Sequence, residues 1–364
     1  MNWEGIIGQK QLIVQLEKLI QTNQVPHAQL ISGPFGYGML SIALSFSKNL
    51  LSFGAHEAHH SYLADLHFIY PVVKKGTEKH AYSSDYATEW DSFIKKSPYG
   101  NYTDWFESIG AGNKQGLIGV AEIEKLHQKM QLKSFDGNGK VCILWGAEKM
   151  NSSAANSFLK LLEEPPKNTF FILLVEDNEQ VLPTVHSRCQ TFALGPIEHQ
   201  VLLEKIPPTF AGNKDQLVSL ANGDYARLLR LLSEEGVGAY EALLVEGLRT
   251  AFKARGNNRV VLSLMEWAQK ICVLGREEQK DFLAFSIQFF RDAFLTNYAL
   301  DKIIHFKAET DFDLTKFSPY VNTNNIRPLV QLFEDAYRYI QGNANAKMVF
   351  TDLSLQISRL INSK

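Results

Sequence analysis

Residues 140–190 read KVCILWGAEKMNSSAANSFLKLLEEPPKNTFFILLVEDNEQVLPTVHSRCQ, and short apolar runs alternate in them with longer amphipathic segments. Two of the runs, Val141–Trp145 and Phe170–Val175, are mostly aliphatic and aromatic over a length that suits a buried strand. A third run begins at Gln190 and ends at Leu194. Strands that alternate with helical segments in this way predict a parallel sheet of the α/β class.

The segments between these runs carry the start and stop signals of helices. Asn151 or Ser152 can cap the helix that follows the first run, because either side chain can accept a hydrogen bond from a free backbone N–H. Pro165 and Pro166 end that helix, since a proline ring cannot continue it. Pro183–Ser187 is expected to form a short helical turn before the third run.

The chain before residue 140 continues the alternation. Apolar residues recur there at helical spacing in several segments, and short apolar runs separate them. The expected elements are a helix at 9–22, a strand at 30–32, a helix at 41–51, a strand at 66–73 and a helix at 118–132. Together with the three later strands, they predict a five-stranded sheet.

Length and composition describe an ordinary globular protein. The 364 residues suffice for two or three domains, and 45% apolar with 21% charged residues is usual for a soluble chain. The net charge of −2 excludes a polycation, so any nucleic-acid contact needs a local basic patch or a partner. We expect a cytoplasmic protein, because the sequence has neither a run of 18 apolar residues nor an apolar signal core at its start.

The residues that could bind a metal do not form a complete ligand set. The cysteines Cys142, Cys189 and Cys272 are far apart and form no C-x-x-C pair, so we expect reduced, structural thiols. Four histidines lie close together in the sequence, at His56, His59, His60 and His67. A His-x3-His pair can bind zinc, but no cysteine or third ligand accompanies it. We expect a polar, solvent-exposed loop and no zinc.

The sequence GPFGYGML, which begins at Gly33, has the frame of a phosphate-binding loop between a strand and a helix. In the working motif G-x-x-x-x-G-K-[ST], backbone N–H groups cradle phosphates, the lysine contacts them and the hydroxyl binds Mg²⁺. Gly33, Gly36 and Gly38 keep the frame, but Met39 takes the lysine position and Leu40 the hydroxyl position. A thioether and an isobutyl group supply neither function. We interpret the loop as vestigial and expect no tightly bound ATP.

Two motifs at a fixed separation carry a family resemblance. The block LEEPP at 162–166, followed by Ser187, Arg188 and Cys189, resembles the clamp-loader branch of the AAA+ ATPases. NWEGIIG at 2–8 resembles the segment that opens such domains beside the adenine pocket. The resemblance implies a P-loop-type parallel sheet of five strands, with the P-loop strand at its centre, a small helical lid and an all-α collar domain.

The resemblance also implies domain boundaries. We expect an AAA+ core at 1–195, a helical lid at 196–238 and a helical collar for oligomerisation at 239–364, where aromatic residues are frequent. Gly236 and Gly238 mark an expected hinge between the last two.

Residues 74–112 look like an insertion into the family pattern. Their periodicity is weak, and short helices are expected at Glu89–Ile94 and Trp105–Ile109. The segment is either a flap that covers the core or an interaction surface.

A second nucleotide motif is also altered. In the family, a strand ends in Asp-Glu, of which the aspartate binds Mg²⁺ and the glutamate polarises water. Aligned on the strand at 141–144, these positions hold Trp145 and Gly146, and Glu148 is out of register. Downstream, GDYARLLRLL resembles the sensor-2 helix, with Arg227 at its arginine. Without a working phosphate site, we expect Arg227 to have a structural role and the chain to lack ATPase activity.

Arg188 matches the arginine that, in clamp loaders, reaches the γ-phosphate bound by a neighbouring subunit. An arginine suits this task because its planar, permanently charged group fits phosphate oxygens. The alternative is that Arg188 pairs with Glu163 or Glu164 of its own chain. The resemblance implies, as partners, the motor (tau/gamma) and delta subunits and, through the complex, the sliding clamp and primer–template DNA.

Three lysines, Lys125, Lys129 and Lys133, recur every four residues. That spacing places them on one helix face, which is either solvated or contacts DNA phosphates.

Two alternatives to an ATPase-inactive clamp-loader subunit remain open: an active motor of the tau/gamma kind, and a replication or repair adaptor outside the clamp loader.

Overall fold

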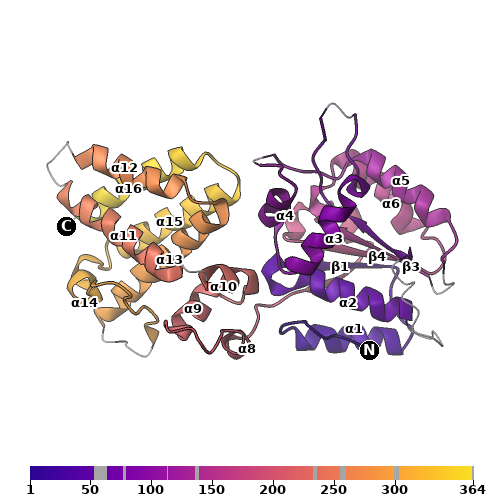
Figure 1. Ribbon diagram of the computed structural model, residues 1–364, viewed down its shortest axis with the longest axis horizontal. Coiled ribbons are helices and arrows are strands. Elements are labelled where there is room, and N and C mark those ends of the chain that lie inside the picture. Colours follow the sequence, from indigo (N-terminus) through magenta and orange to yellow (C-terminus); the bar gives the residue numbers. More distant parts are fainter. Residues whose placement is uncertain are drawn as a thin grey trace. The chain divides into compact units, whose positions relative to one another are not determined.

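The computed structural model describes residues 1–52, 64–76, 79–112, 114–135, 139–232, 236–254, 260–298, 300 and 303–362. The chain divides into two compact units (Figure 1), of which the first comprises Met1–Val201 and Gly223–Ala226. The second comprises Leu202–Asn222 and Arg227–Lys364. The three domains expected from the sequence stay a prediction.

The first unit is built on a parallel five-stranded sheet, as predicted. Its strands are β1 Ala28–Ser32, β2 Leu66–Ile69, β3 Lys140–Trp145, β4 Thr169–Val175 and β5 Gln190–Ala193. Their order is β2-β3-β4-β1-β5. The strand before the glycine-rich loop, β1, is paired on both sides but is not at the centre as expected. That place belongs to β4, because only β5 lies beyond β1.

Helices cover both faces of this sheet (Figure 1). Their bounds are α1 Lys10–Gln21, α2 Met39–Ser52, α3 Ala87–Lys96, α4 Tyr102–Ser108, α5 Val120–Gln131, α6 Ser152–Glu163 and α7 Pro183–His186. Residues of β3 alternate between the two faces: Val141, Ile143 and Trp145 pack with α1–α4, whereas Cys142 and Leu144 pack with α5 and α6.

Local signals explain the ends of several elements. Asn151 caps α6, since its side chain accepts a hydrogen bond from the backbone N–H of Ala154 at 2.8 Å. Pro183 is the first residue of α7, where its missing N–H costs nothing. Strand β2 stops at Ile69, earlier than expected, because Pro71 cannot donate to a strand ladder.

Residues 79–112 pack over the face of the sheet that carries α1 and α2. The two expected short helices are present as α3 and α4, joined to β2 through the 3-10 helix η3, Ser83–Tyr86. The side chains of Trp90, Phe93 and Trp105 are buried and contact one another with ring centroids 5.2–5.6 Å apart. This segment therefore supplies part of the hydrophobic core.

The second unit is helical in its described residues, which confirms the helical C-terminal region. Its helices are α9 Lys214–Ala221, α11 Gly236–Lys253, α12 Val260–Cys272, α13 Arg276–Thr296, α14 Leu314–Phe317, α15 Ile326–Gln341 and α16 Ala346–Asn362. The chain passes between the units three times: within α8 His199–Leu203, between Asn222 and Gly223, and within α10 Tyr225–Leu231. Phe282, Phe285, Phe289 and Phe290 are buried on α13.

The two glycines at which a hinge is expected lie in the first turn of a helix, and the hinge itself stays a prediction. Helix α11 already begins at Gly236 and runs through Gly238. A glycine suits the second position because a Cβ there would lie 2.7 Å from the carboxylate of Glu309.

Candidate functional site

The loop after β1 has the shape of a phosphate cradle, but several of its N–H groups form hydrogen bonds within the chain. Gly33 and Gly38 adopt positive φ values of 143° and 97°, which favour glycine. The N–H of Gly33 donates to the carbonyl of Val175 at 3.1 Å. Within the loop, Tyr37 N–H donates to Pro34 and Gly38 N–H to Phe35, both at 3.0 Å. These donors are directed at the chain's own carbonyls.

Met39 and Leu40 begin α2 and point into the core. Met39 is 0% exposed and Leu40 is 2% exposed, and both belong to the hydrophobic cluster on this face of the sheet. Their side chains therefore contribute to packing at the positions where a working loop has its lysine and its hydroxyl.

The end of β3 is equally apolar. The Trp145 side chain is completely buried, and its ring centroid lies 5.0 Å from that of Phe35 and 4.9 Å from that of Tyr102. Gly146 follows with a φ of 79°, and a Cβ there would lie 2.5 Å from the Tyr102 hydroxyl. A glutamate in place of Gly146, where the motif has one, would therefore require Tyr102 to move.

Glu148, which the sequence alignment places out of register, is bound within the chain. Its Oε1 atom accepts hydrogen bonds from the Tyr102 hydroxyl at 2.6 Å and from the Glu176 N–H at 3.2 Å. Burial raises the pKa of this carboxyl, and the hydrogen bond from Tyr102 partly opposes the increase. The carboxylate therefore holds the end of β3 against α4.

Arg188 lies between α7 and β5 on the surface of the first unit. Its side chain is 36% exposed and pairs with Glu163 on α6, with 2.7 Å between Nη2 and Oε1. Its Nη1 atom donates to the Thr184 carbonyl at 2.9 Å. The pairing considered as an alternative is therefore present. The neighbouring Ser187 hydroxyl donates to the same carbonyl at 3.2 Å, and burial raises the pKa of Cys189 to about 12.

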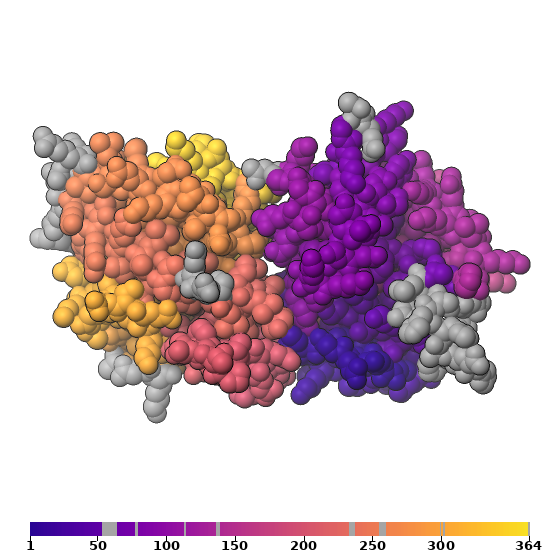
Figure 2. Space-filling model, viewed as in Figure 1, coloured from indigo at the N-terminus to yellow at the C-terminus, as the bar shows by residue number. Residues whose placement is uncertain are grey.

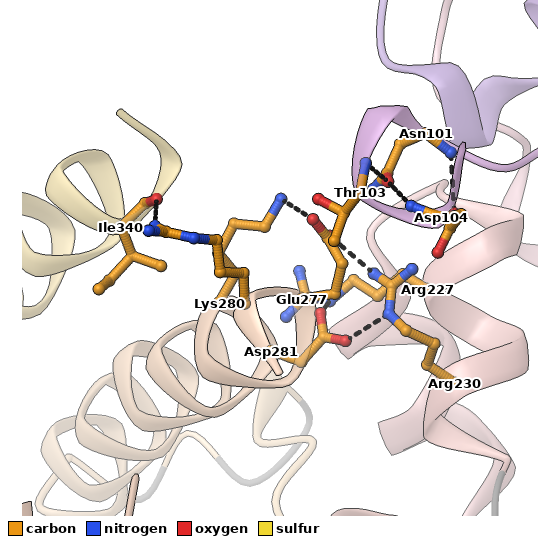
Figure 3. A network of polar contacts seen from close by, with 10 residues as sticks. Asn101, Thr103, Asp104, Arg227, Arg230, Glu277, Lys280, Asp281 and Ile340 are labelled. Atoms are coloured by element: carbon orange, nitrogen blue, oxygen red, sulfur yellow. Dashed lines mark hydrogen bonds and ion pairs between the residues drawn. The ribbon is translucent and has the colours of Figure 1, made fainter. Parts of the chain in front are cut away.

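Arg227 belongs to an ion-pair network of the second unit (Figure 3). Its Nε lies 2.9 Å from a carboxylate oxygen of Asp281, a residue of α13 that is 2% exposed. Arg230, one turn further along α10, pairs with the same carboxylate at 2.8 Å and with Glu277 at 3.6 Å. Lys280 pairs with Glu277 at 2.7 Å. The network fastens α10 to α13.

The prediction that three lysines share one helix face is wrong for one of them. Helix α5 ends at Gln131, so Lys133 lies beyond it and does not share a helix face with Lys125 and Lys129. The Lys125 ammonium group donates to the hydroxyl of Ser84 at 2.8 Å and lies 4.6 Å from the centre of the Tyr82 ring.

Among the residues that the structure describes, no group of three His, Cys, Asp or Glu side chains is placed to hold a metal ion. His56, His59 and His60 lie outside the described residues. His67 is half-buried on β2, and burial lowers its pKa to about 4, assisted by Lys129 and Lys140. No helix in the described parts of the chain is long and apolar enough to span a membrane.

Sequence reasoning missed Tyr99 and Tyr102, which lie against the glycine-rich loop and the end of β3. The Tyr99 hydroxyl accepts a hydrogen bond from the N–H of Ile7 at 2.8 Å. The detectable signal was the density of aromatic residues in 74–112, but weak periodicity gave no indication of where their rings would lie.

The sheet order and the loop after β1 define the first unit as a P-loop-type α/β protein. A family model described as "DNA polymerase III, delta subunit" matches residues 8–198, which is more than half of the chain. The chain belongs to this family.

Individual relatives agree with this membership. Subunit delta′ of DNA polymerase III from Bacillus subtilis is 26% identical over 199 residues, which are 54% of this chain and 51% of that protein. Subunit tau from the same organism is 23% identical over 370 residues, covering 96% of this chain and 60% of the relative. The chain thus spans only about half to three-fifths of these relatives. The match to the solved structure of a DNA polymerase III gamma subunit-related protein from Thermotoga maritima covers 96% of this chain and 100% of that one, at 17% identity and a TM-score of 0.42.

Proposed function

We propose that the chain is a delta′-type subunit of a bacterial clamp loader that does not hydrolyse ATP itself and presents Arg188 to the ATP of a neighbouring motor subunit. The family membership and the delta′ relatives support the placement in DNA polymerase III. The proposed absence of ATPase activity rests on the burial of Met39 and Leu40 at the positions of the motif's lysine and hydroxyl. No metal or tightly bound nucleotide is needed by the chain itself.

The position of Arg188 is compatible with a role towards another subunit. Its guanidinium is exposed, and its pairing with Glu163 joins two side chains that are 36% and 50% exposed. Ion pairs of this kind contribute roughly 0–1 kcal/mol, because water and salt screen them. A γ-phosphate carries more charge than one carboxylate and accepts both prongs of the guanidinium. Exchange of Glu163 for phosphate on assembly is therefore energetically accessible.

The partners follow from the same proposal. Motor (tau/gamma) and delta subunits would complete the ring, the helical C-terminal unit would act as a collar, and the complex would place a sliding clamp on primer–template DNA. Reconstitution with motor and delta subunits tests this: the chain should join the complex and support DNA-stimulated ATPase activity while showing none alone. A chain that does not co-purify with these subunits would instead be an adaptor outside the clamp loader.

One observation favours a second candidate, an active motor of the tau/gamma kind. The match to the Bacillus subtilis tau subunit extends over 96% of this chain, further than the match to delta′. A motor must bind MgATP by itself, so a nucleotide titration of the isolated chain separates the two candidates.

A further inference from the structure

We infer that Tyr99 and Tyr102, from the segment 74–112, occupy the space in which a P-loop protein holds its nucleotide. The inference rests on the proposed function and extends it: the site is closed by the chain's own aromatic side chains in addition to lacking its lysine, hydroxyl and acidic pair. In this inference, the segment 74–112 fills the nucleotide site with its own side chains.

Tyr99 covers the glycine-rich loop where a phosphate would lie. Phosphates bind at the N-terminus of the helix that follows such a loop, which here is the start of α2. A Cβ on Gly38, directly before that helix, would lie 2.7 Å from the Tyr99 ring. The Tyr99 hydroxyl hydrogen-bonds the Ser41 side chain in the first turn of α2 and accepts from the Ile7 N–H. Tyr99 is 5% exposed, so the ring is enclosed.

Tyr102 closes the side of the loop that faces β3. Its ring lies edge-on to Phe35 of the loop, with centroids 4.7 Å apart, and 4.9 Å from Trp145. Its hydroxyl donates to Glu148 at 2.6 Å. In a working site, this region between loop and strand holds Mg²⁺ and the attacking water. Here it is filled by contacting aromatic rings.

An acidic side chain reinforces the closure. A Cβ on Gly36 would lie only 1.8 Å from Oδ1 of Asp224, so this carboxylate lies directly on the backbone of the loop. A negative charge at that point repels phosphate. The next residue, Tyr225, contacts the Tyr99 ring with centroids 5.1 Å apart. The occupants of the site thus contact one another as well as the loop.

As a consequence, side chains of the chain itself stabilise the glycine-rich loop, and no ligand is required for this. In an ordinary P-loop protein, bound nucleotide stabilises the folded state by mass action. In this chain, covalently attached tyrosines take that position, so its stability should not respond to ATP. Atoms of residues 79–112, purple in Figure 2, lie on the surface of the first unit in that view.

The test compares nucleotide-dependent melting temperatures of full-length variants. Tyr99→Ala should lower Tm by several degrees, and millimolar ADP or ATP should recover part of the loss, because the vacated space admits nucleotide. Phe158→Ala is the matched control: it removes a fully buried ring from the opposite face of the sheet. It should lower Tm without any recovery by nucleotide.

A second comparison separates the effect of Tyr99 filling the site from the effect of the missing lysine and hydroxyl. The pair Met39→Lys with Leu40→Thr restores the motif, yet alone it should bind ATP at least about tenfold more weakly than the same pair combined with Tyr99→Ala. Equal binding by the pair and the triple variant would overturn the inference. If restoring the motif prevents folding, the Tyr99→Ala and Phe158→Ala comparison decides: equal insensitivity of both to nucleotide overturns it.

Failure of the proposed function gives a different result. Micromolar binding of MgATP by the wild-type chain would contradict the proposed inactivity itself. If nucleotide changes the melting temperature of neither the wild type nor the Tyr99→Ala variant, only the inference is overturned.

Discussion

Arg188 makes surface contacts within its own chain and is the residue that we propose contacts the ATP of a neighbouring subunit. Its guanidinium contacts Glu163 and the Thr184 carbonyl, both near the surface. Neither contact is enclosed, so neither holds the side chain strongly.

We predict that Arg188→Ala changes the free energy of unfolding by no more than about 0.5 kcal/mol, as is usual for surface substitutions. In the reconstituted complex, the variant should lose DNA-stimulated ATPase activity at the site this subunit completes. Arg188→Lys should rescue poorly, because an ammonium group lacks the bidentate fork. ATPase rates and melting temperature are measured on one preparation.

Glu163→Gln is the control for this prediction, since it weakens the ion pair but keeps the guanidinium. It should preserve ATPase activity of the complex. If instead Arg188→Ala and Glu163→Gln both lower the melting temperature and leave ATPase activity unchanged, Arg188 has only a structural role.

The buried carboxyl of Glu122 predicts a pH dependence. It accepts a hydrogen bond from Ser83 N–H at 2.7 Å, and burial raises its pKa above the ordinary 4.5. Between these two pKa values the folded chain binds more protons than the unfolded chain. The stability from this group is therefore fully present below pH 4.5 and is lost as pH rises through the folded pKa.

Glu122→Gln should remove this contribution. Urea unfolding at a series of pH values from about 4 to 7 measures it: the difference in unfolding free energy between wild type and variant should change across the window in favour of the variant as pH rises. A difference that stays constant with pH would contradict the raised pKa.

At the scale of elements, α3 and α4 bring tryptophans into the core of the first unit. Trp105 is completely buried, and its Nε1 atom donates to the Pro71 carbonyl at 2.8 Å. The segment that resembled an insertion is therefore integrated into the fold.

We predict that Trp105→Ala destabilises the chain by about 3–5 kcal/mol, because it leaves a large cavity and an unpaired carbonyl. Denaturant unfolding measures the loss. Phe135→Ala, at an aromatic side chain that is 76% exposed, is the control and should change stability by no more than about 0.5 kcal/mol. A loss below about 1 kcal/mol for Trp105→Ala would mean that α4 does not contribute to a cooperative core.

The elements were predictable wherever local patterns decide them. Apolar runs located β3 and β4, and caps and prolines located α6 and α7. The hydrogen bond of Tyr99 to Ile7, between residues 92 positions apart, was not predictable, because no periodicity records contacts at such separation.

At the scale of the whole molecule, the geometry of the glycine-rich loop and the family membership both support the proposed function. The motifs at Met39–Leu40 and Trp145–Gly146 were readable in the sequence, and their positions in the structure are apolar or sterically filled. The role that we propose for the chain lies in assembly and in completing a neighbour's site.

Calorimetric titration of the isolated wild-type chain with MgATP tests this account most directly, with a motor subunit as positive control. Because Met39 and Leu40 are buried and Tyr99 lies on Gly38, we predict no saturable heat up to millimolar ATP. Saturable binding of MgATP with a micromolar Kd would contradict the account and make the chain a motor.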